Sequence, residues 1–410
     1  MRILHTSDWH LGRTLHGEDL HAHHAAFLDH LVEVVRERAV DVVLVAGDVY
    51  DRAVPGVPTV RLLSDALGRL SALATVIVTP GNHDSAARLG FASALLRDGL
   101  RILASAEALD EPVVIDDAHG PVAFYGLPYL DPDAVRASLA PAGSPPLPRS
   151  HEAVLGAAMD RVRADAAGRP DARVVVVAHA FVTGAEPSES ERDIRVGGFD
   201  QVPAAAFSGA DYVALGHLHG AQEVRAAGAG VGAPPIGAPP IGAPPIGVPR
   251  IRAPRIRYSG SPLAFSFGER LQRKSSALVE LAADGSTAVE LIPAPVPRRL
   301  AEVTGTLAEI TDGRHADLAD AWLRVHVTDP VHPAHLVARV REALPHALVV
   351  LHEPEGRVEG VRSRVVDATT DPLEVAADFV EYATGAAPTE PELHVLRQAY
   401  EDALAADGSA

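Results

Sequence analysis

The sequence predicts an α/β protein with two β-sheets flanked by helices, followed by a small α+β domain and a C-terminal helix–loop–helix. Three observations predict this fold. Short β-branched apolar runs alternate with helical periodicity near the N-terminus, which is typical of α/β domains. Similar runs follow one another more closely in the middle of the chain, and a proline-rich stretch then separates a shorter region. At 410 residues the chain is too long for one ordinary core, so we expect several domains.

The first domain is expected to span residues 1–295. Its first strands are short β-branched runs at 3–6, 42–46, 76–79 and 174–178. Helices between the first three are indicated by apolar residues at helical spacing, such as Phe27, Leu31 and Val35. The later runs predict a second, more antiparallel sheet from residues 122–127, 212–215, 256–259, 277–281 and 289–292.

A Pro/Gly repeat loop interrupts this domain at residues 228–254. The repeated unit is GAPPI, followed by the variants GVPRI and RAPRI. This proline and glycine density forbids a helix or an inner strand, so the segment is predicted to be polyproline-like or disordered. A repeat this regular is typical of the expansion of one copy. We expect it to have no function of its own, with partner binding as the alternative.

The stretch PAPVPRR at 293–299 predicts a linker. Residues 298–366 follow it as an α+β capping domain, with strands at 322–327 and 347–351 around a helix near 333–343. Residues 371–403 are then helical on both sides of the stretch TGAAPTEPE. A helix–loop–helix of this size cannot bury its apolar stripe alone, so it packs on the body of the protein or on a partner.

Composition excludes several kinds of chemistry. The chain has no cysteine, so disulfides, thiolate catalysis and thiolate metal ligands are excluded. It has no apolar run of membrane-spanning length and no signal peptide at the N-terminus, so we expect a cytoplasmic protein. The net charge of −18 argues against coating nucleic acid by charge alone. Residues 248–275 nevertheless hold seven basic residues against Glu269 and are a candidate DNA contact; Lys274 among them is the only lysine, which we attribute to compositional bias.

Metal-ligand types follow five predicted strands in order: Asp8 and His10; Asp48; Asn82, His83 and Asp84; His179; and His217 and His219. In α/β sheets the carboxyl ends of strands are where sites assemble. Two divalent cations about 3.5–4 Å apart can clamp the attacking and leaving oxygens of a phosphoryl transfer. A carboxylate between them offsets their charge, and imidazoles complete the shells. The five motifs together therefore predict a two-metal phosphoryl-transfer centre.

The ordered set D-x-H, G-D, G-N-H-D, H and G-H-x-H resembles the calcineurin-like metallophosphoesterases. The longer stretches are similar to the SbcD-type nuclease subunits, bacterial relatives of the nuclease in eukaryotic and archaeal double-strand-break repair complexes. They are HTSDWHLG (5–12), AGDVYDRAVP (46–55), GNHDS (81–85), GHLH (216–219) and YSGSPLAFSFGE (258–269). The resemblance covers essentially the whole chain and implies a two-sheet metallophosphoesterase sandwich.

The resemblance also implies a role for each site residue. One metal is assigned to Asp8, His10 and His219, and the other to Asn82, His179 and His217, with Asp48 bridging. His83 stands over the scissile phosphate as a catalytic residue, and Asp84 is expected to orient it. The cofactors are two divalent cations, with manganese expected, although the ligand types would also accept iron or zinc.

The implied function is a DNA nuclease subunit with single-strand endonuclease and double-strand exonuclease activity. It would process hairpins and DNA ends in repair, recombination and replication, and lie on the nucleoid when bound to DNA. The implied partner is an SbcC-type coiled-coil ATPase docked through residues 371–403, in a heterotetramer that contains a homodimer of this chain. A small-substrate metallophosphodiesterase and a non-catalytic DNA-end scaffold are the alternatives. The extra domains disfavour the first, and the complete ligand set disfavours the second.

The densest histidine cluster is not part of this prediction. It comprises His16, His21, His23 and His24. No carboxylate motif accompanies these histidines, so we expect solvated surface side chains.

Overall fold

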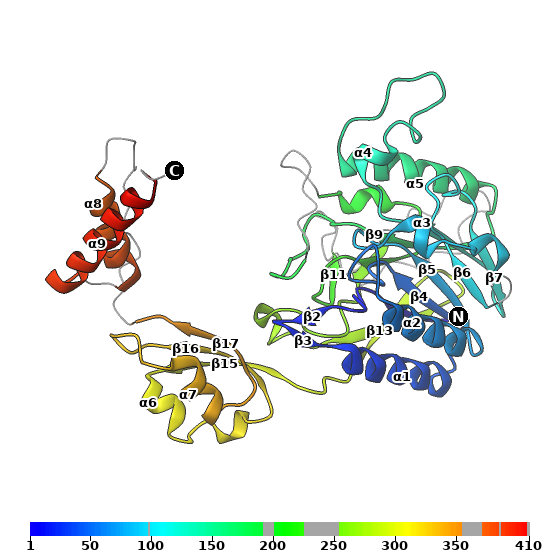
Figure 1. The fold of residues 1–410 in the computed structure, drawn as a ribbon. Coiled ribbons are helices and arrows are strands. Elements are labelled where there is room, and N and C mark those ends of the chain that lie inside the picture. The colour runs from blue at the N-terminus through cyan, green and yellow to red at the C-terminus, as the bar shows by residue number, and fades with distance from the viewer. Residues whose placement is uncertain (97–98, 192–200, 225–253, 355–370, 385–386, 408–410) are drawn as a thin grey trace, which may run out of the picture. The chain divides into compact units, whose positions relative to one another are not determined.

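The computed structural model describes residues 1–96, 99–191, 201–224, 254–354, 371–384 and 387–407 (Figure 1). It divides into two compact units, Met1–Pro297 and Arg298–Ala410. The Pro/Gly repeat loop falls almost entirely on residues 225–253, which lie outside the described residues. Within the described part, no helix is long and apolar enough to cross a membrane.

The first unit contains two six-stranded sheets. The first sheet has the order β14-β13-β1-β4-β5-β6. Its parallel strands are β1 (Arg2–Thr6), β4 (Val42–Ala46), β5 (Thr75–Thr79) and β6 (Leu100–Ile102). The antiparallel hairpin of β13 (Ser275–Leu281) and β14 (Thr287–Pro293) extends it beyond β1. Helices α1 (His21–Glu37) and α2 (Val57–Ser71) bury apolar stripes against one face of this sheet.

The second sheet has the order β11-β12-β10-β9-β8-β7. Its four central strands are parallel: β8 (Gly120–Leu127), β9 (Arg173–His179), β10 (Tyr212–Gly216) and β12 (Arg255–Tyr258). The edge strands β7 (Val113–Asp117) and β11 (Gln222–Val224) are antiparallel to their neighbours. Helix α5 (His151–Ala167) covers the outer face through Val154, Ala158 and Val162. Shorter elements are β2 (Thr14–Leu15), β3 (Glu18–Asp19), α3 (Ala86–Leu89) and α4 (Pro132–Val135).

The predicted two-sheet sandwich is confirmed, but the allocation of strands to sheets differs from the prediction. The run 174–178 belongs to the second sheet, and the runs 277–281 and 289–292 join the first. The second sheet is also mainly parallel, not antiparallel. The spacing of apolar runs along the chain reports only how long the connections between strands are. It does not show which strands pair, and the pairing of Ile3 with Val279 joins residues from opposite ends of this unit.

The core between the sheets explains why β4 is buried along its whole length. Val43 and Val45 face the helices, whereas Leu44 packs with Val175 and Val177 of β9 in the layer between the sheets. Side chains of a strand alternate between its two faces, so a strand covered on both faces is apolar throughout. The packing of β4 against β9 and β10 brings the carboxyl ends of strands from both sheets to one place.

The second unit alternates strands and helices. It runs through β15 (Leu300–Gly305), α6 (Leu307–Thr311), β16 (Trp322–Val327), α7 (Leu336–Ala343) and β17 (Ala347–His352), and its three strands are parallel. The predicted helix lies between the two predicted strands, but β15 was not predicted and the parallel pairing replaces the expected α+β arrangement. Strand β15 has only Val303 fully buried, so its sequence carries little apolar signal. Helices α8 (Pro372–Thr384) and α9 (Glu390–Asp407) contact each other.

The buried Arg173 of β9 forms an ion pair whose contribution to the stability of the second sheet can be measured. Its guanidinium donates to the Asp117 carboxylate at 2.5 Å and to the Gly120 carbonyl at 2.9 Å, and only 2% of its side chain is exposed. The hydrogen bond from Arg173 holds the pKa of Asp117 below its usual range. We expect Asp117→Asn to lower the free energy of unfolding by about 3 kcal/mol at pH 7, because a buried cation loses its charged partner.

The pH dependence of this effect has a defined sign. Because the folded-state pKa of Asp117 is depressed, the stabilisation is complete above the unfolded pKa of about 4 and declines as the pH falls below it. Urea unfolding at pH 7 and at pH 3 should therefore show a smaller difference between wild type and variant at pH 3. The neighbouring, exposed Asp116 supplies the control, since Asp116→Asn should change stability by less than about 0.5 kcal/mol. Equal stability of wild type and Asp117→Asn at pH 7 would contradict this interpretation.

Candidate metal centre

The structure places every predicted site residue just beyond, or at the end of, a strand of the first unit. Asp8 and His10 follow β1, Asp48 follows β4, and Asn82, His83 and Asp84 follow β5. His179 ends β9, and His217 and His219 follow β10. Three overlapping groups have ligand atoms within 4.8 Å of one another: Asp8, His10 and His219; His10, Asp48 and His83; and Asp8, Asp48 and His179.

Four of these residues have a left-handed backbone. The φ angles are 53° at Asp8, 44° at His10, 49° at Asp48 and 105° at His217. Such angles cost of order 1–3 kcal/mol each for residues other than glycine, and they cluster at functional sites. Hydrogen bonds between neighbouring loops hold this backbone, from the Asp8 amide to the Gly47 carbonyl at 3.0 Å and from the His10 amide to the Asp48 carbonyl at 2.9 Å.

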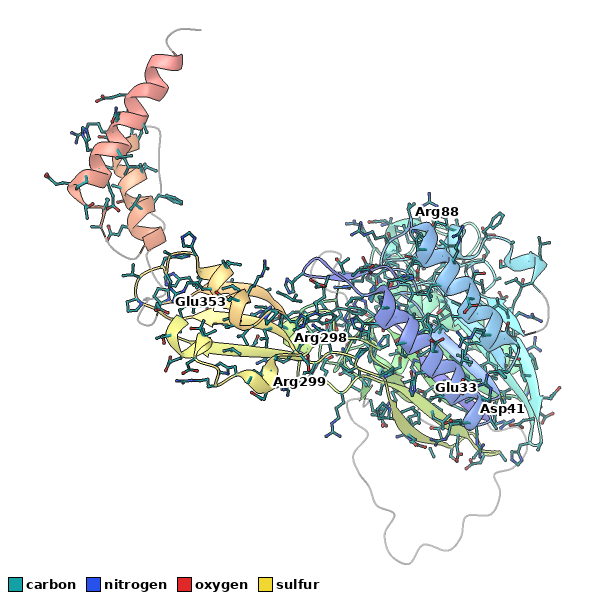
Figure 2. All side chains as sticks on the ribbon, turned by 60° about the horizontal axis from the view of Figure 1, so that its bottom comes forward. Glu33, Asp41, Arg88, Arg298, Arg299 and Glu353 are labelled. Atoms are coloured by element: carbon teal, nitrogen blue, oxygen red, sulfur yellow. The ribbon has the colours of Figure 1, made fainter. Side chains whose placement is uncertain are left out.

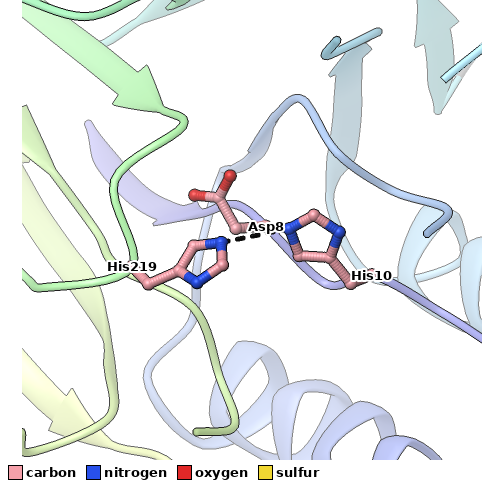
Figure 3. Close-up of side chains that lie close together, drawn as sticks. All are labelled: Asp8, His10 and His219. Atoms are coloured by element: carbon pink, nitrogen blue, oxygen red, sulfur yellow. Dashed lines mark hydrogen bonds between the residues drawn. The ribbon is translucent and has the colours of Figure 1, made fainter. Parts of the chain in front are cut away.

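The first donor group is formed by Asp8, His10 and His219 (Figure 3). The Nε2 atoms of the two imidazoles lie 3.1 Å apart, and each ring is at most 1% exposed. Two ligands about 2.1 Å from one ion, at roughly 90° to each other, are separated by about 3.0 Å. Burial lowers the pKa of His10 well below its usual value, which favours the neutral ring that a metal requires.

The second donor group is formed by Asn82, His179 and His217. The Asn82 Oδ1 atom lies 2.9 Å from His179 Nε2 and 3.3 Å from His217 Nδ1. His179 Nδ1 lies 3.1 Å from the Ala46 carbonyl, to which it can only donate. Burial opposes a charge on this ring, but the Asp48 carboxylate outweighs it and raises the pKa of His179 to about 9, so a bound metal would displace a proton from Nε2. Burial lowers the pKa of His217 to about 3, so this ring is neutral at pH 7.

Asp48 lies between the two groups. Its Oδ2 atom is 3.6 Å from His10 Nε2 and 3.4 Å from His179 Nε2. Burial opposes ionisation of this carboxyl, but the imidazoles of His179, His10 and His83 outweigh it and hold the pKa of Asp48 well below its usual range. Asp8 differs, because burial raises its pKa to about 6. The ionised Asp48 carboxylate thus lies within 3.6 Å of one imidazole in each donor group, and a carboxylate oxygen of Asp8 also lies within 4.8 Å of a His179 ring nitrogen.

His83 has one anchored and one free ring nitrogen. Its Nδ1 atom lies 2.9 Å from the Asp51 carbonyl, which can only accept, so the proton is on Nδ1. Its Nε2 atom is buried and has no hydrogen-bond partner among the described residues. The ring lies edge-to-face against His10, with centroids 4.7 Å apart. His83 therefore presents an unused nitrogen beside the first donor group.

Asp84 does not have the expected contact with His83. Its carboxylate accepts from the backbone amides of Gly81, Val49 and Tyr50 at 2.9–3.0 Å, and no hydrogen bond to the His83 ring is found in the described structure. Burial raises the pKa of this carboxyl to about 7. Asp84 thus holds together the loops that carry Asp48 and His83, and the Asp51 carbonyl orients the His83 ring.

Two further predictions require correction. His24 of the histidine cluster is fully buried, with its ring 6.3 Å from that of Phe265, so it is not a solvated side chain. In the candidate DNA contact at 248–275, residues 248–253 lie outside the described residues, Arg257 and Lys274 are buried, and Arg270 and Arg273 are exposed. Arg257 lies on β12, and its guanidinium is 3.6 Å from the carboxylate of Glu223. Histidine, arginine and lysine side chains can thus be buried in the folded protein, and composition alone does not show which of them are.

Phe265 is a site residue to which the sequence prediction gave no role. Its ring packs edge-to-face on His10 and His219, with centroid distances of 5.2 and 5.4 Å. The Arg13 guanidinium covers the ring at 4.7 Å from its centroid. Phe265 lies within the quoted stretch YSGSPLAFSFGE, so the motif marked the segment but not this contact.

Gly216 must be a glycine because the chain approaches β4 closely at this point. A Cβ atom on Gly216 would lie 1.7 Å from the Ala46 carbonyl oxygen. We expect Gly216→Ala to lower the free energy of unfolding by about 3 kcal/mol, because the backbone next to His217 must move. Mn²⁺ binding should weaken in parallel, as measured by isothermal titration calorimetry.

The control for this substitution is Gly156→Ala in α5, where an added Cβ meets nothing within 4 Å. Alanine favours the helix there, so we expect a gain of about 0.5–1 kcal/mol in the free energy of unfolding and unchanged Mn²⁺ binding. A Gly216→Ala protein as stable as wild type would show that the close approach is not required.

The fold is an α/β sandwich, and its site joins two donor groups of nitrogen and oxygen ligands through one carboxylate. Together they define a class of protein, the metal-dependent phosphoesterases. Comparison with known proteins agrees with this class. Residues 1–221 match the family model of the calcineurin-like phosphoesterases, and residues 296–384 match the model described as the type 5 capsule protein repressor C-terminal domain (SbcD_C). The chain is 30% identical over 363 residues to the SbcD subunit of the SbcCD nuclease from Escherichia coli K12 and from E. coli O157:H7, covering 85% of this chain and 83% of each relative.

The chain therefore belongs to the calcineurin-like phosphoesterases, as an SbcD-type member. Members of this family are metal-dependent hydrolases. The crystal structure of TT1561 of Thermus thermophilus is a more distant match, with 14% identity, a TM-score of 0.37 and coverage of 71% of this chain and 98% of that one.

Proposed function

We propose that the protein is the DNA nuclease subunit of an SbcC–SbcD-type complex and acts as a two-metal phosphodiesterase. The observation that carries this proposal is the position of Asp48, whose Oδ2 atom lies within 3.6 Å of one imidazole in each donor group. A shared carboxylate is what two adjacent dications require. The relatives from E. coli are named as nuclease subunits, which supports DNA as the substrate.

We assign one ion to Asp8, His10 and His219 and the other to Asn82, His179 and His217, with Asp48 shared. The donor set fits divalent cations, because it consists of carboxylate, amide and imidazole groups, and two of the rings are held neutral by burial. When bound, the two ions stabilise the charge that develops on the phosphodiester oxygens. Manganese is our proposed metal, although the same donors accept iron or zinc.

His83 is the proposed proton donor to the leaving oxygen. Its Nδ1 proton is engaged by the Asp51 carbonyl, so any proton that the ring gives up comes from Nε2. The contact with His10 keeps this nitrogen beside the first donor group. An imidazole can donate a proton to a leaving oxygen within hydrogen-bond reach, as general acids in enzymes do. The role of Asp84 is then to hold the loops, not to take part in proton transfer.

The C-terminal helices are the proposed docking element for an SbcC-type coiled-coil ATPase. Phe379 of α8 is 67% exposed and Val395 of α9 is 64% exposed, which leaves apolar surface for a partner helix. We further propose a homodimer of this chain within a heterotetramer, with single-strand endonuclease and double-strand exonuclease activity on hairpins and DNA ends. These activities would serve repair, recombination and replication.

The test uses purified protein with Mn²⁺ on hairpin DNA, linear duplex DNA and the small diester bis(p-nitrophenyl) phosphate. We expect hydrolysis of the DNA substrates, and its loss when a chelator removes the metal. Turnover of the small diester without any DNA cleavage would favour a small-substrate phosphodiesterase. DNA binding without hydrolysis of any substrate would favour a scaffold subunit. Adding an SbcC-type ATPase and comparing rates would test the proposed partnership.

A further inference from the structure

A buried ion pair lies behind His219. Glu269 ends the short helix η3 (Phe267–Glu269) and has no exposed surface. Its Oε2 atom accepts a hydrogen bond of 2.5 Å from Nζ of Lys274, whose side chain is 2% exposed. Lys274 also donates to the Ser261 hydroxyl at 2.9 Å and to the His219 carbonyl at 3.1 Å. This pair therefore touches a proposed metal ligand but belongs to none of the donor groups.

The other oxygen of Glu269 faces the His219 ring. Glu269 Oε1 lies 3.3 Å from His219 Nδ1, and the Ser190 hydroxyl lies 2.5 Å from the same nitrogen and is hydrogen-bonded to Glu269 Oε1. A carboxylate can only accept, so the Ser190 hydroxyl donates to Glu269 and accepts from His219. Both the direct route and the route through Ser190 place the ring proton on Nδ1. The lone pair is then on Nε2, the atom 3.1 Å from His10 Nε2.

We propose that Glu269 and Lys274 are positioning residues that fix His219 in the tautomer whose Nε2 atom binds metal. The inference rests on the proposed metal site and deepens it. Lys274 occupies Oε2, so only Oε1 is left for His219. Metal-ligating histidines commonly donate their second N–H to a carboxylate, and such partners change metal affinity by about 10–100-fold.

This role also gives a physical reason for a lysine at position 274, where 35 of the 36 basic residues of the chain are arginine. The ammonium is compact and fits among acceptors from Glu269, Ser261, Gln272 and the His219 backbone. A guanidinium is larger and carries five donors in a planar fork. Lys274 is thus explained by its site and not by composition.

The decisive variant is Glu269→Gln. Lys274 can donate only to the amide oxygen, so the amide NH₂ group is turned toward Ser190 and His219. The hydrogen-bond direction then reverses, Nδ1 becomes the acceptor, and the proton moves to Nε2. Isothermal titration calorimetry of the full chain with Mn²⁺ should show one of two sites weakened by about 10–100-fold and the other changed by less than about twofold.

The double variant Glu269→Gln/Lys274→Met separates positioning from simple disruption. Without the ammonium the amide is free to turn its oxygen toward Ser190 and His219, so Mn²⁺ affinity at the weakened site should recover at least about threefold over the single variant. It also leaves no unpaired buried charge, so it tests the proposal even where the single variant folds poorly. Thermal unfolding of the metal-free proteins reports on folding separately.

Glu33→Gln is the matched control. Glu33 lies on α1 and forms an exposed pair with Arg36 at 2.6 Å, and Figure 2 shows it on the outer side of that helix. Its loss should leave both Mn²⁺ sites unchanged.

The positioning role would be overturned if Glu269→Gln bound both Mn²⁺ ions with wild-type affinity. It would also be overturned if the double variant bound Mn²⁺ as weakly as the single variant. A lower unfolding temperature with unchanged Mn²⁺ binding would have the same consequence. A wild-type protein that binds two ions but does not cleave DNA would refute the nuclease and leave the positioning role standing, whereas one that binds no Mn²⁺ would refute both.

Discussion

Asp48→Asn is expected to lower kcat/KM on DNA by at least about 1,000-fold and to weaken the binding of both Mn²⁺ ions. Asp48 Oδ2 lies between His10 and His179, and an amide oxygen in its place carries no charge to offset two dications. The substitution also disturbs His83, since Asp48 Oδ1 accepts from the His83 backbone amide at 2.9 Å. One substitution should therefore affect both donor groups and the proposed proton donor together.

Calorimetry with Mn²⁺ and DNA cleavage assays measure these effects on the same preparation. Asp116→Asn is the matched control, because it removes an exposed carboxylate of the same unit on β7, and it should leave both readouts unchanged. An Asp48→Asn protein that still binds two ions with wild-type affinity would show that this carboxylate is not shared between them.

His83→Ala is expected to reduce kcat on DNA by about 10²–10⁴-fold while Mn²⁺ binding stays within about threefold of wild type. The ring is not assigned to either ion, and its free Nε2 atom is the group available to the leaving oxygen. An alkoxide leaving group of DNA needs a proton, whereas p-nitrophenolate leaves readily without one. The variant should therefore retain much more activity on bis(p-nitrophenyl) phosphate than on DNA.

The comparison of the two substrates decides the role of this histidine. A similar loss on both would assign His83 to charge stabilisation instead of proton donation. Full activity of His83→Ala on DNA would remove it from the mechanism. Loss of Mn²⁺ binding would make His83 a ligand, consistent with its proximity to His10 and Asp48.

The sequence predicted the components of this site better than the contacts between them. Asp8, Asp48 and His179 could be predicted because each follows an apolar β-branched run, and strand ends gather at one edge. The Asp51 carbonyl that orients His83 could not be predicted, because every residue has a backbone carbonyl and only the folded structure shows which one lies beside the His83 ring.

The order of the strands in the sheets could not be predicted from the sequence for a related reason. The pairing of β13 with β1 and the contact of Glu269 with His219, 50 residues away, both depend on segments that meet only after folding. Local periodicity reports which residues are apolar and at what spacing. It does not report which distant segment covers them, so His24 and Lys274 could be placed only by the structure.

The convergence of two sheets at the site links metal supply to stability. Asp8, His10, Asp48 and Asn82 follow strands of the first sheet, whereas His179, His217 and His219 lie at the ends of strands of the second. Ions held in this way bind the native state and not the unfolded chain, so each contributes about 4 kcal/mol at a free concentration 1,000 times its Kd. Metal starvation would then deplete the folded enzyme as well as its activity, and the amount of protein surviving proteolysis would follow the metal content of its surroundings.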